Sequence, residues 1–325
     1  ITGDVLVRVS DRLRKTDAEH DSQLAINLCN QDPSRSICFK TVSVLPQNAS
    51  LKLEGTGTED DRLTGFNQIV KYDAGAWTLG ADFQAGSASD SYQTGDFRGT
   101  LSINVDDATG QLILTGNVTD NGDGTTGSLV KNGNGTLTLS GTSTYSGSTA
   151  INAGTLETNG GNAIGNDSAV TVASGATLSL TSGETIGSLA GAGSVNLNGQ
   201  ILRAGGNNTS TTYSGSINGS GSLEKFGTGT LTLSGTSNST GSLLVQEGAL
   251  DARGAFSMLT TVGTLATLKG SGTVGGLTNL GRVAPGNSVG VLNVSGNYFQ
   301  DTSGTLEIEI TPDGSAADQL LVGGN

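Results

Sequence analysis

Apolar and polar residues alternate over short segments along most of the chain. In the segment TLTLSG at 136–141, Leu137 and Leu139 alternate with threonine and serine, and Leu231 and Leu233 repeat the pattern. Successive side chains of a β-strand point to opposite faces, so the pattern predicts many short strands with one apolar face. Other predicted inward residues are Val170, Val172, Leu178, Leu180, Val195, Leu197, Ile201, Leu292, Val294, Leu306, Ile308 and Ile310.

Glycine separates these predicted strands. The chain has 52 glycines and only four prolines, and pairs such as Asn198-Gly199 and Asn218-Gly219 are typical of tight turns. Glycine at this level opposes helices, and only residues 11–28 have a weakly helical pattern.

One phrase occurs twice. Residues 129–156 and 223–250 are identical at 16 of 28 positions, around the core K-x-G-x-G-T-L-T-L-S-G. A third, eroded copy runs from Val70 to Gly80. There Trp77 stands where the other copies have a leucine. The predicted repeat core is Trp77, Leu79, Leu137, Leu139, Leu231 and Leu233.

A strand-rich chain with internal repeats is typical of a solenoid or a propeller. The two copies lie 94 residues apart, which we interpret as four coils of 23–24 residues. A propeller blade of about 40–45 residues fits this offset less well. The predicted fold is therefore an all-β parallel β-helix whose coils turn three times, with aliphatic residues inside and threonine and serine outside.

Charge and hydropathy argue against nucleic acid as a partner and against a membrane-spanning helix. The net charge of −13 argues against nucleic acid, which requires clustered Lys and Arg. No stretch approaches the roughly 18 apolar residues of a membrane helix, and no signal peptide is recognisable. The chain starts without Met, and we expect that both ends were cut from a longer protein.

Cys29 and Cys38 are the only cysteines, and the residues between them are typical of a turn. The favoured interpretation is a local disulfide, which implies the periplasm or the cell exterior. The alternative is two buried free thiols. Two cysteines and one distant histidine are a poor zinc set, so we expect neither a metal nor a cofactor.

Candidate catalytic residues are few. Residues 286–290 match G-x-S-x-G, but that motif requires a strand–turn–helix context and a histidine later in the chain. The one histidine is His20, which is expected on the surface. We therefore expect a structural turn, no catalytic residue and no enzymatic activity in this chain.

Three polar segments have weaker functional interpretations. Residues 120–124 could suggest calcium, but an acidic turn fits better because the spacing of known calcium loops is absent. The charged residues at 54–62 are expected to form a solvated loop. Residues 84–98 interrupt the strand rhythm, and together with the segment 1–60 they are where we expect ligand contacts.

The repeats resemble a known family. The segment LVKNGNGTLTLSGTSTYSGSTAINAGTL is similar to the passenger-associated repeat of Gram-negative autotransporters, the type V secretion group that includes pertactin. Residues 268–310 are similar to the autochaperone segment of such passengers, with the PGNS turn at 285–288 as its most specific part. The matching apolar and turn residues are Pro285, Gly286, Val291, Leu292, Val294, Tyr298, Phe299, Leu306, Ile308 and Ile310.

This resemblance covers roughly residues 63–325 and implies a right-handed parallel β-helix. It also implies export through the periplasm, display at or release from the outer membrane, and a C-terminal outer-membrane barrel as partner. The expected domains are N-terminal coils or a loop-rich cap at 1–62, the repeat region at 63–267 and the autochaperone-like end at 268–325. We expect that end to be the most stable part and to template the coils before it.

The expected function is that of a surface-exposed passenger stem acting in adhesion, with a host surface, matrix or serum protein as partner. One alternative is the non-catalytic stem of a secreted protease or esterase whose catalytic domain precedes residue 1. Another is self-association of columns through outward Ser, Thr and Asn residues.

Overall fold

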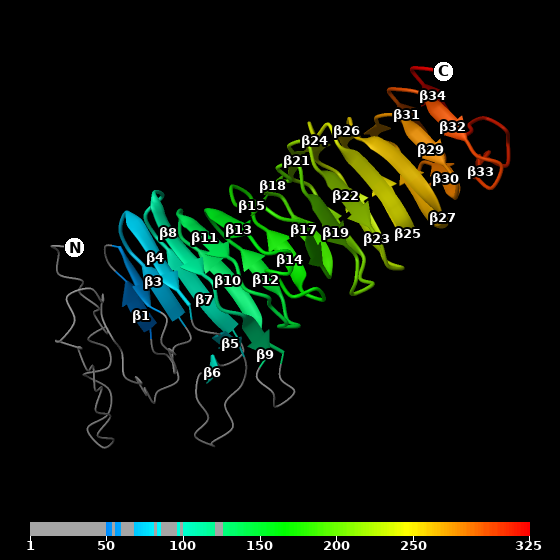
Figure 1. The fold of residues 1–325 in the computed structure, drawn as a ribbon. Helices are drawn as coiled ribbons and strands as arrows, with labels where there is room; N and C mark the ends of the chain where they lie inside the picture. The colour runs from blue at the N-terminus through cyan, green and yellow to red at the C-terminus, as the bar shows by residue number, and fades with distance from the viewer. Residues whose placement is uncertain are drawn as a thin grey trace, which may run out of the picture. The chain divides into compact units, whose positions relative to one another are not determined.

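The computed structural model describes residues 50–53, 56–59, 68–80, 83–85, 96–97, 100–120 and 126–325. Every regular element in this part of the chain is a β-strand, and every pairing between these strands is parallel (Figure 1). The predicted all-β, parallel β-helix class is therefore confirmed. The helical segment expected at 11–28 lies outside the described residues.

The chain divides into two compact units, Ile1–Gly165 and Asn166–Asn325. Each unit is a stack of coils. The domain limits expected at residues 62 and 267 remain predictions.

The first unit has three stacks of strands. One contains β1, β3, β7, β10 and β12, a second contains β2, β4, β8, β11 and β13, and a third pairs β5 with β6 and β9. Their bounds are β1 Ser50–Leu53, β2 Gly57–Glu59, β3 Gln68–Lys71, β4 Gly75–Leu79, β5 Phe83–Ala85, β6 Asp96–Phe97, β7 Thr100–Val105, β8 Gly110–Leu114, β9 Val118–Asp120, β10 Ser128–Asn132, β11 Thr136–Leu139, β12 Thr149–Ile151 and β13 Thr155–Thr158.

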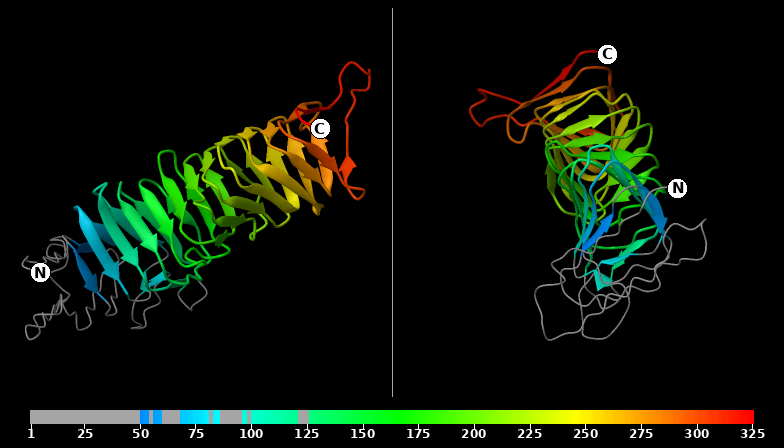
Figure 2. Two further views of the ribbon diagram at one scale, coloured as in Figure 1. Left: turned by 45° about the horizontal axis from the view of Figure 1, so that its top comes forward. Right: turned by 90° about the vertical axis from the view of Figure 1, so that its left-hand side faces the viewer.

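The second unit also has three stacks of strands, which begin with β14, β15 and β16, and Figure 2 shows the strands stacked along this unit. Strands β25 and β27 are long enough to turn a corner, so each belongs to two faces, and their pairing shifts register between Val245 and Glu247. The bounds are β14 Ala169–Val172, β15 Thr177–Leu180, β16 Glu184–Ile186, β17 Ser188–Gly191, β18 Ser194–Asn196, β19 Ile201–Ala204, β20 Thr211–Tyr213, β21 Ser216–Asn218, β22 Ser222–Lys225, β23 Thr230–Leu233, β24 Thr236–Ser237, β25 Ser242–Ala252, β26 Ala255–Phe256, β27 Leu259–Gly270, β28 Thr273–Val274, β29 Leu277–Asn279, β30 Arg282–Pro285, β31 Val291–Val294, β32 Tyr298–Gln300, β33 Thr305–Leu306 and β34 Gln319–Val322.

The coils that contain the two repeats are shorter than predicted. Leu137 pairs with Leu156 in the first unit, and Leu223 pairs with Leu243 in the second. One coil therefore contains several residues fewer than the sequence predicted. The 94-residue offset between the two repeats is not a whole number of coils. That estimate was wrong because it assumed that both copies start at the same corner.

Inward side chains form continuous columns. Trp77, Leu112, Leu137 and Leu156 occupy successive rungs of one buried column in the first unit. In the second unit a column runs from Leu231 through Leu250, Leu268 and Val283 to Leu306. All six residues of the predicted repeat core are buried: Trp77, Leu79, Leu137, Leu139, Leu231 and Leu233.

Several predicted inward residues are not buried. In β19 the inward residue is Leu202, whereas Ile201 is only half-buried, because the strand starts one residue out of the expected register. Leu306 lies in an inner column, but 39% of it is exposed since no described coil covers it. Ile308 and Ile310 follow β33 in a hairpin-like loop, in which Ile310 bridges Ala317, and both side chains are exposed.

The other residues of the predicted autochaperone core differ in how far they are buried. Pro285, Gly286, Leu292 and Val294 are buried. Val291 and Tyr298 are half-buried, and Phe299 is 58% exposed because it lies on the outer side of the last coil. Some apolar side chains of this segment are therefore buried in the core, and others are exposed on the last described coil.

Candidate functional site

The lysine of the first repeat copy is buried at a corner between two faces. Lys131 is 0% exposed, and its side chain turns toward the corner between β10 and β11. Its Nζ donates hydrogen bonds to the backbone carbonyls of Asn132 at 2.8 Å, Gly133 at 2.8 Å and Ala153 at 3.1 Å. The first two acceptors belong to the same corner, and the third belongs to the corner of the next coil.

The second copy repeats this arrangement. Lys225 is 2% exposed, and its Nζ donates to the carbonyls of Phe226 at 2.8 Å, Gly227 at 2.6 Å and Glu247 at 3.1 Å. Glu247 again lies in the corner of the following coil. The repeated phrase thus specifies a corner with one ammonium and three carbonyl acceptors.

The glycine two residues after each lysine is required by the same corner. Gly133 has φ +75° and Gly227 has φ +71°, a conformation that L-residues adopt only with strain. A Cβ at Gly133 would lie 2.2 Å from the Val105 carbonyl oxygen, and one at Gly227 would lie 2.1 Å from that of Gly205. The K-x-G spacing therefore encodes both the buried donor and the close backbone approach.

Burial changes the ionisation of both lysines. Loss of hydration lowers the pKa of Lys131 to about 8, although the carboxylate of Asp106 opposes the shift. The pKa of Lys225 is likewise lowered by burial to about 8, against the opposing effect of Glu247. Neither ammonium is accessible, so the low pKa does not make these lysines surface nucleophiles.

The eroded copy has a related corner. Lys71 is fully buried, and its Nζ donates to the carbonyl of Asp73 at 2.5 Å, to that of Ala74 at 3.4 Å and to the Asp73 carboxylate. These bonds lie within the corner of its own coil.

A polar residue that the sequence did not single out has a similar role near the C-terminal end. Asn279 is completely buried, and its Oδ1 accepts a hydrogen bond from the Gly281 N–H at 3.1 Å. Its Nδ2 donates to the Gln300 side chain and to the Thr305 carbonyl, both at 3.0 Å. An asparagine next to glycine-rich turns has no distinctive sequence signal, and only the register reveals its inward direction.

The PGNS turn is bound to a buried carboxylate. Asn287 Nδ2 donates to Asp251 Oδ1 at 3.0 Å, and Arg253 donates two hydrogen bonds to Asp251 Oδ2. Burial of Asp251 opposes its ionisation, but the hydrogen bonds from Arg253 and Asn287 outweigh this effect, so its pKa is lowered. The turn is thereby tied to β25, two coils earlier.

A second carboxylate fixes the loop after this turn. Asp318 is buried, and it accepts hydrogen bonds from the backbone N–H groups of Gly290 and Glu309, both at 2.8 Å. Asp251 and Asp318 therefore hold the two sides of the predicted autochaperone segment. Sequence analysis did not identify either residue.

The G-x-S-x-G match is a turn between two strands. Ser288 is exposed between β30 and β31, and no helix follows it, so the context of a nucleophile elbow is absent. Within the described residues no group of three His, Cys, Asp or Glu side chains could hold a metal ion.

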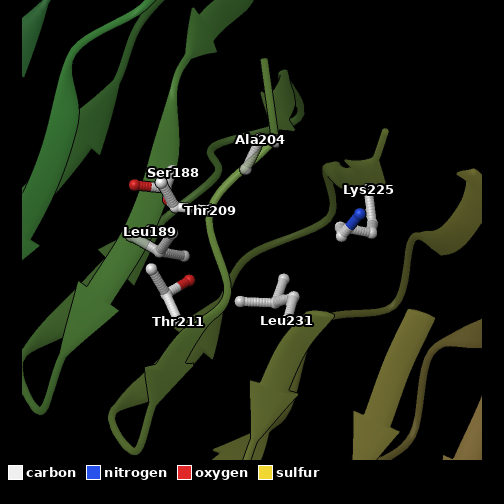
Figure 3. Close-up of a pocket in the computed structure, with 8 residues that line it drawn as sticks. Ser188, Leu189, Ala204, Thr209, Thr211, Lys225 and Leu231 are labelled. Carbon is white, nitrogen blue, oxygen red and sulfur yellow. The ribbon is translucent and has the colours of Figure 1, made fainter. Parts of the chain in front are cut away.

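A cavity in the second unit is too small for a ligand (Figure 3). Its volume is about 10 Å³, close to the space of one water molecule. The lining residues are Ser188, Leu189, Ala204, Gly205, Thr209, Thr211, Lys225 and Leu231.

Outward polar residues form ladders along the coils. Asn152 Nδ2 donates to Asn132 Oδ1 at 2.8 Å, and Ser242 Oγ donates to Ser222 Oγ at 2.9 Å. These groups already bond to their neighbours in the same column. Self-association through such ladders stays a prediction.

Several sequence predictions fall on residues outside the described part. These are the Cys29–Cys38 disulfide, His20 and most of the segments 54–62 and 84–98. Asp120 is described, and its carboxylate accepts hydrogen bonds from the Gly127 N–H and from Ser146. The described residues contain no helix that is long and apolar enough to cross a membrane.

Comparison with known proteins agrees with this architecture. The family model described as passenger-associated-transport-repeat matches residues 129–157 and 223–252, the segments that contain the two lysine corners. The chain is 35% identical over 161 residues to the adhesin BmaC autotransporter of Brucella suis, which covers 47% of this chain and 5% of that protein. It is 35% identical over 104 residues to an extracellular serine protease of Serratia marcescens, which covers 31% of this chain and 10% of that protein.

The chain thus spans only a small part of these curated relatives, and no solved structure matches it significantly. The fold and the repeats define a parallel β-solenoid built from passenger-associated repeats. The chain therefore contains two passenger-associated-transport repeats and is similar over part of its length to an autotransporter adhesin.

Proposed function

We propose that this passenger acts as a stem in adhesion and that its partner is a host surface, matrix or serum protein. The observation that supports adhesion is the similarity to an autotransporter adhesin over 161 residues. A column of stacked coils is a rigid scaffold, and binding residues usually lie on loops that such a scaffold presents. The proposed contact segments are 84–98 and 1–60.

The full chain tests this proposal in a plate assay against fibronectin, collagen, laminin and whole serum. We expect saturable binding that is reduced when residues 86–95 are replaced by Gly and Ser in equal number. Replacement of residues 173–175, in the exposed turn between β14 and β15, by Gly and Ser is the control. If the folded chain shows no saturable binding to any of these surfaces, the adhesive role is overturned.

A non-catalytic stem of a secreted enzyme is the second candidate. It is supported by the similarity to an extracellular serine protease over 104 residues. A catalytic domain would then lie before residue 1. The reading frame upstream of Ile1 distinguishes this candidate, because a protease or esterase triad encoded there would make the stem role the correct one.

We also propose that residues 268–325 template the folding of the coils before them. The support is that Leu268, Val274, Val283 and Leu292 of this segment are buried and that two carboxylates fix its turns. Proteolysis in rising urea is the test. We expect the last resistant fragment to contain these residues, and a resistant fragment from the N-terminal half would contradict the proposal.

A further inference from the structure

Buried polar side chains occur at only some rungs of the inner corner columns. Lys225, Val245, Val262 and Asn279 are paired rung to rung in one column of the second unit. In the first unit Lys131 lies between Ile103 and Ile151 in its own column. Corners therefore form with valine or isoleucine at this position, so the polar side chains are not needed merely to turn the chain.

Each of these polar groups connects its own corner with the coil that follows it in sequence. Lys131 reaches the carbonyls of Gly133 and Ala153, and Lys225 reaches those of Gly227 and Glu247. Asn279 accepts from Gly281 in its own corner and donates to the Thr305 carbonyl one coil later. Three independent positions thus share one direction.

We infer that Lys131, Lys225 and Asn279 are inter-coil clamps, which make the order of each corner depend on the coil that follows it. A buried donor whose acceptor is removed keeps its desolvation penalty, so a clamp is fully satisfied only when the following coil is in place. Apolar rungs such as Val245 stack on either neighbour and carry no such direction.

The clamps provide a mechanism for the templating proposed above. The order of folding that they imply, from the C-terminal coils to the N-terminal ones, rests on that proposed function. A coil added to the N-terminal side of a folded stack finds the third acceptor of its clamp already present. A coil added to the C-terminal side leaves the clamp before it incomplete until its own corner has formed. The coupling itself is an equilibrium property of the folded chain and is tested separately.

Hydrogen exchange of the full chain measures the coupling. In the variant Lys225→Met, which keeps most of the length of the side chain but removes its donors, we expect exchange at the corners 226–229 and 246–248 to rise by about tenfold or more. The preceding corner at 205–208 should change much less. Lys269→Met, on the outer side of β27, is the matched control and should leave all three corners unchanged.

A rise confined to 226–229, or an equal rise at 205–208, would overturn the clamp. Asn279→Val repeats the test at the second position, where exchange at 303–306 is expected to increase. If Lys225→Met does not fold, the wild-type chain still provides a measurement. The ammonium hydrogens of Lys131 and Lys225 should give slowly exchanging 1H–15N signals, assigned with the single Lys→Arg variants, and rapid exchange of both would refute the clamp.

The failure of templating is distinguishable from the failure of the clamps. Pulse-labelling during refolding reports which coils form first. Early protection of the N-terminal unit would contradict templating while leaving the equilibrium coupling at 246–248 intact.

Discussion

Lys131 and Ala153 lie in successive coils, and the ammonium of the first donates a 3.1 Å hydrogen bond to the carbonyl of the second. The repeated phrase at 129–156 contains both partners, because the lysine lies near its start and the corner of the next coil lies near its end. The phrase is therefore longer than one coil. Its length matches what is needed to specify a corner together with its neighbour.

Removing the donor of this corner is expected to destabilise the first unit. Lys131→Met leaves three backbone carbonyls without their ammonium partner, which costs about 1–3 kcal/mol in the free energy of unfolding. Urea denaturation followed by circular dichroism measures it. Lys269→Met again serves as control, and equal stabilities of both variants would show that the ammonium contributes nothing net.

The pH dependence of stability follows from the lowered pKa of the clamping lysines. The pKa of Lys225 is about 8 in the folded chain and 10.5 as the ordinary value, so between these values the unfolded chain binds more protons. The free energy of unfolding should therefore rise through this window, by on the order of 1–3 kcal/mol per lysine. Wild type and Lys225→Met are compared at pH 7.5 and pH 10.

The wild-type chain is expected to gain stability relative to Lys225→Met as the pH rises. A relative loss would mean that the charged form is held by its three carbonyl bonds more strongly than burial disfavours it.

Two glycines with similar backbone angles should respond differently to alanine. Gly227→Ala combines a positive φ with a Cβ 2.1 Å from a carbonyl oxygen, and we expect a loss of about 3 kcal/mol or more. Gly175 has φ +84°, but a methyl group placed there would meet nothing within 4 Å, so Gly175→Ala should cost only about 1–2 kcal/mol. Equal losses of stability for the two variants in thermal denaturation would show that the positive φ alone, and not the contact of the Cβ, determines the cost.

Trp77 is the one tryptophan of the chain and is buried in the column that contains Leu112 and Leu137. Trp77→Ala should cost about 3–5 kcal/mol because it leaves a large cavity. Trp77→Leu, which restores the residue of the other repeats, should cost less. Leu265→Ala, at a position that is 77% exposed, is the control. Denaturant midpoints measured by circular dichroism rank the variants, and a Leu variant as unstable as Ala would contradict the shared column.

Acid should loosen the C-terminal segment through Asp251. Its folded pKa is lowered, so its contribution to stability is present above the ordinary value of 3.8 and is lost as the pH falls below it. Asp251→Asn should therefore abolish part of the acid sensitivity and lower stability at pH 7. Glu309→Gln, at an exposed position, is the matched control. An unchanged midpoint for Asp251→Asn would show that the turn is held without this carboxylate.

The alternation in TLTLSG was sufficient to predict strands, an apolar interior and the burial of Leu137 and Leu231, because a strand has a side-chain period of two. The equivalence of Trp77 and Leu137 also followed from the repeat. The length of the coil did not, since a repeat that spans two corners does not show where one circuit ends.

The corners that contain buried polar side chains were harder to predict from the sequence. Lys131 and Lys225 were recognised as repeat positions, but a lysine is usually exposed, and only the three carbonyl acceptors explain its burial. Asn279, Asp251 and Asp318 have no local motif, because their partners lie in other coils. Ile308 and Ile310 were wrongly predicted to point inward, because the apolar–polar alternation continues into a loop that lies outside the stack of coils.

The open space around Gly175 has a practical consequence. The turn between β14 and β15 is exposed and closed by a hydrogen bond from the Ala176 N–H to the Ala173 carbonyl, and no neighbouring atom crowds it. A foreign peptide inserted there would extend away from the stack without disturbing a rung. The turn is therefore a suitable position for inserting an epitope or an affinity tag into this protein.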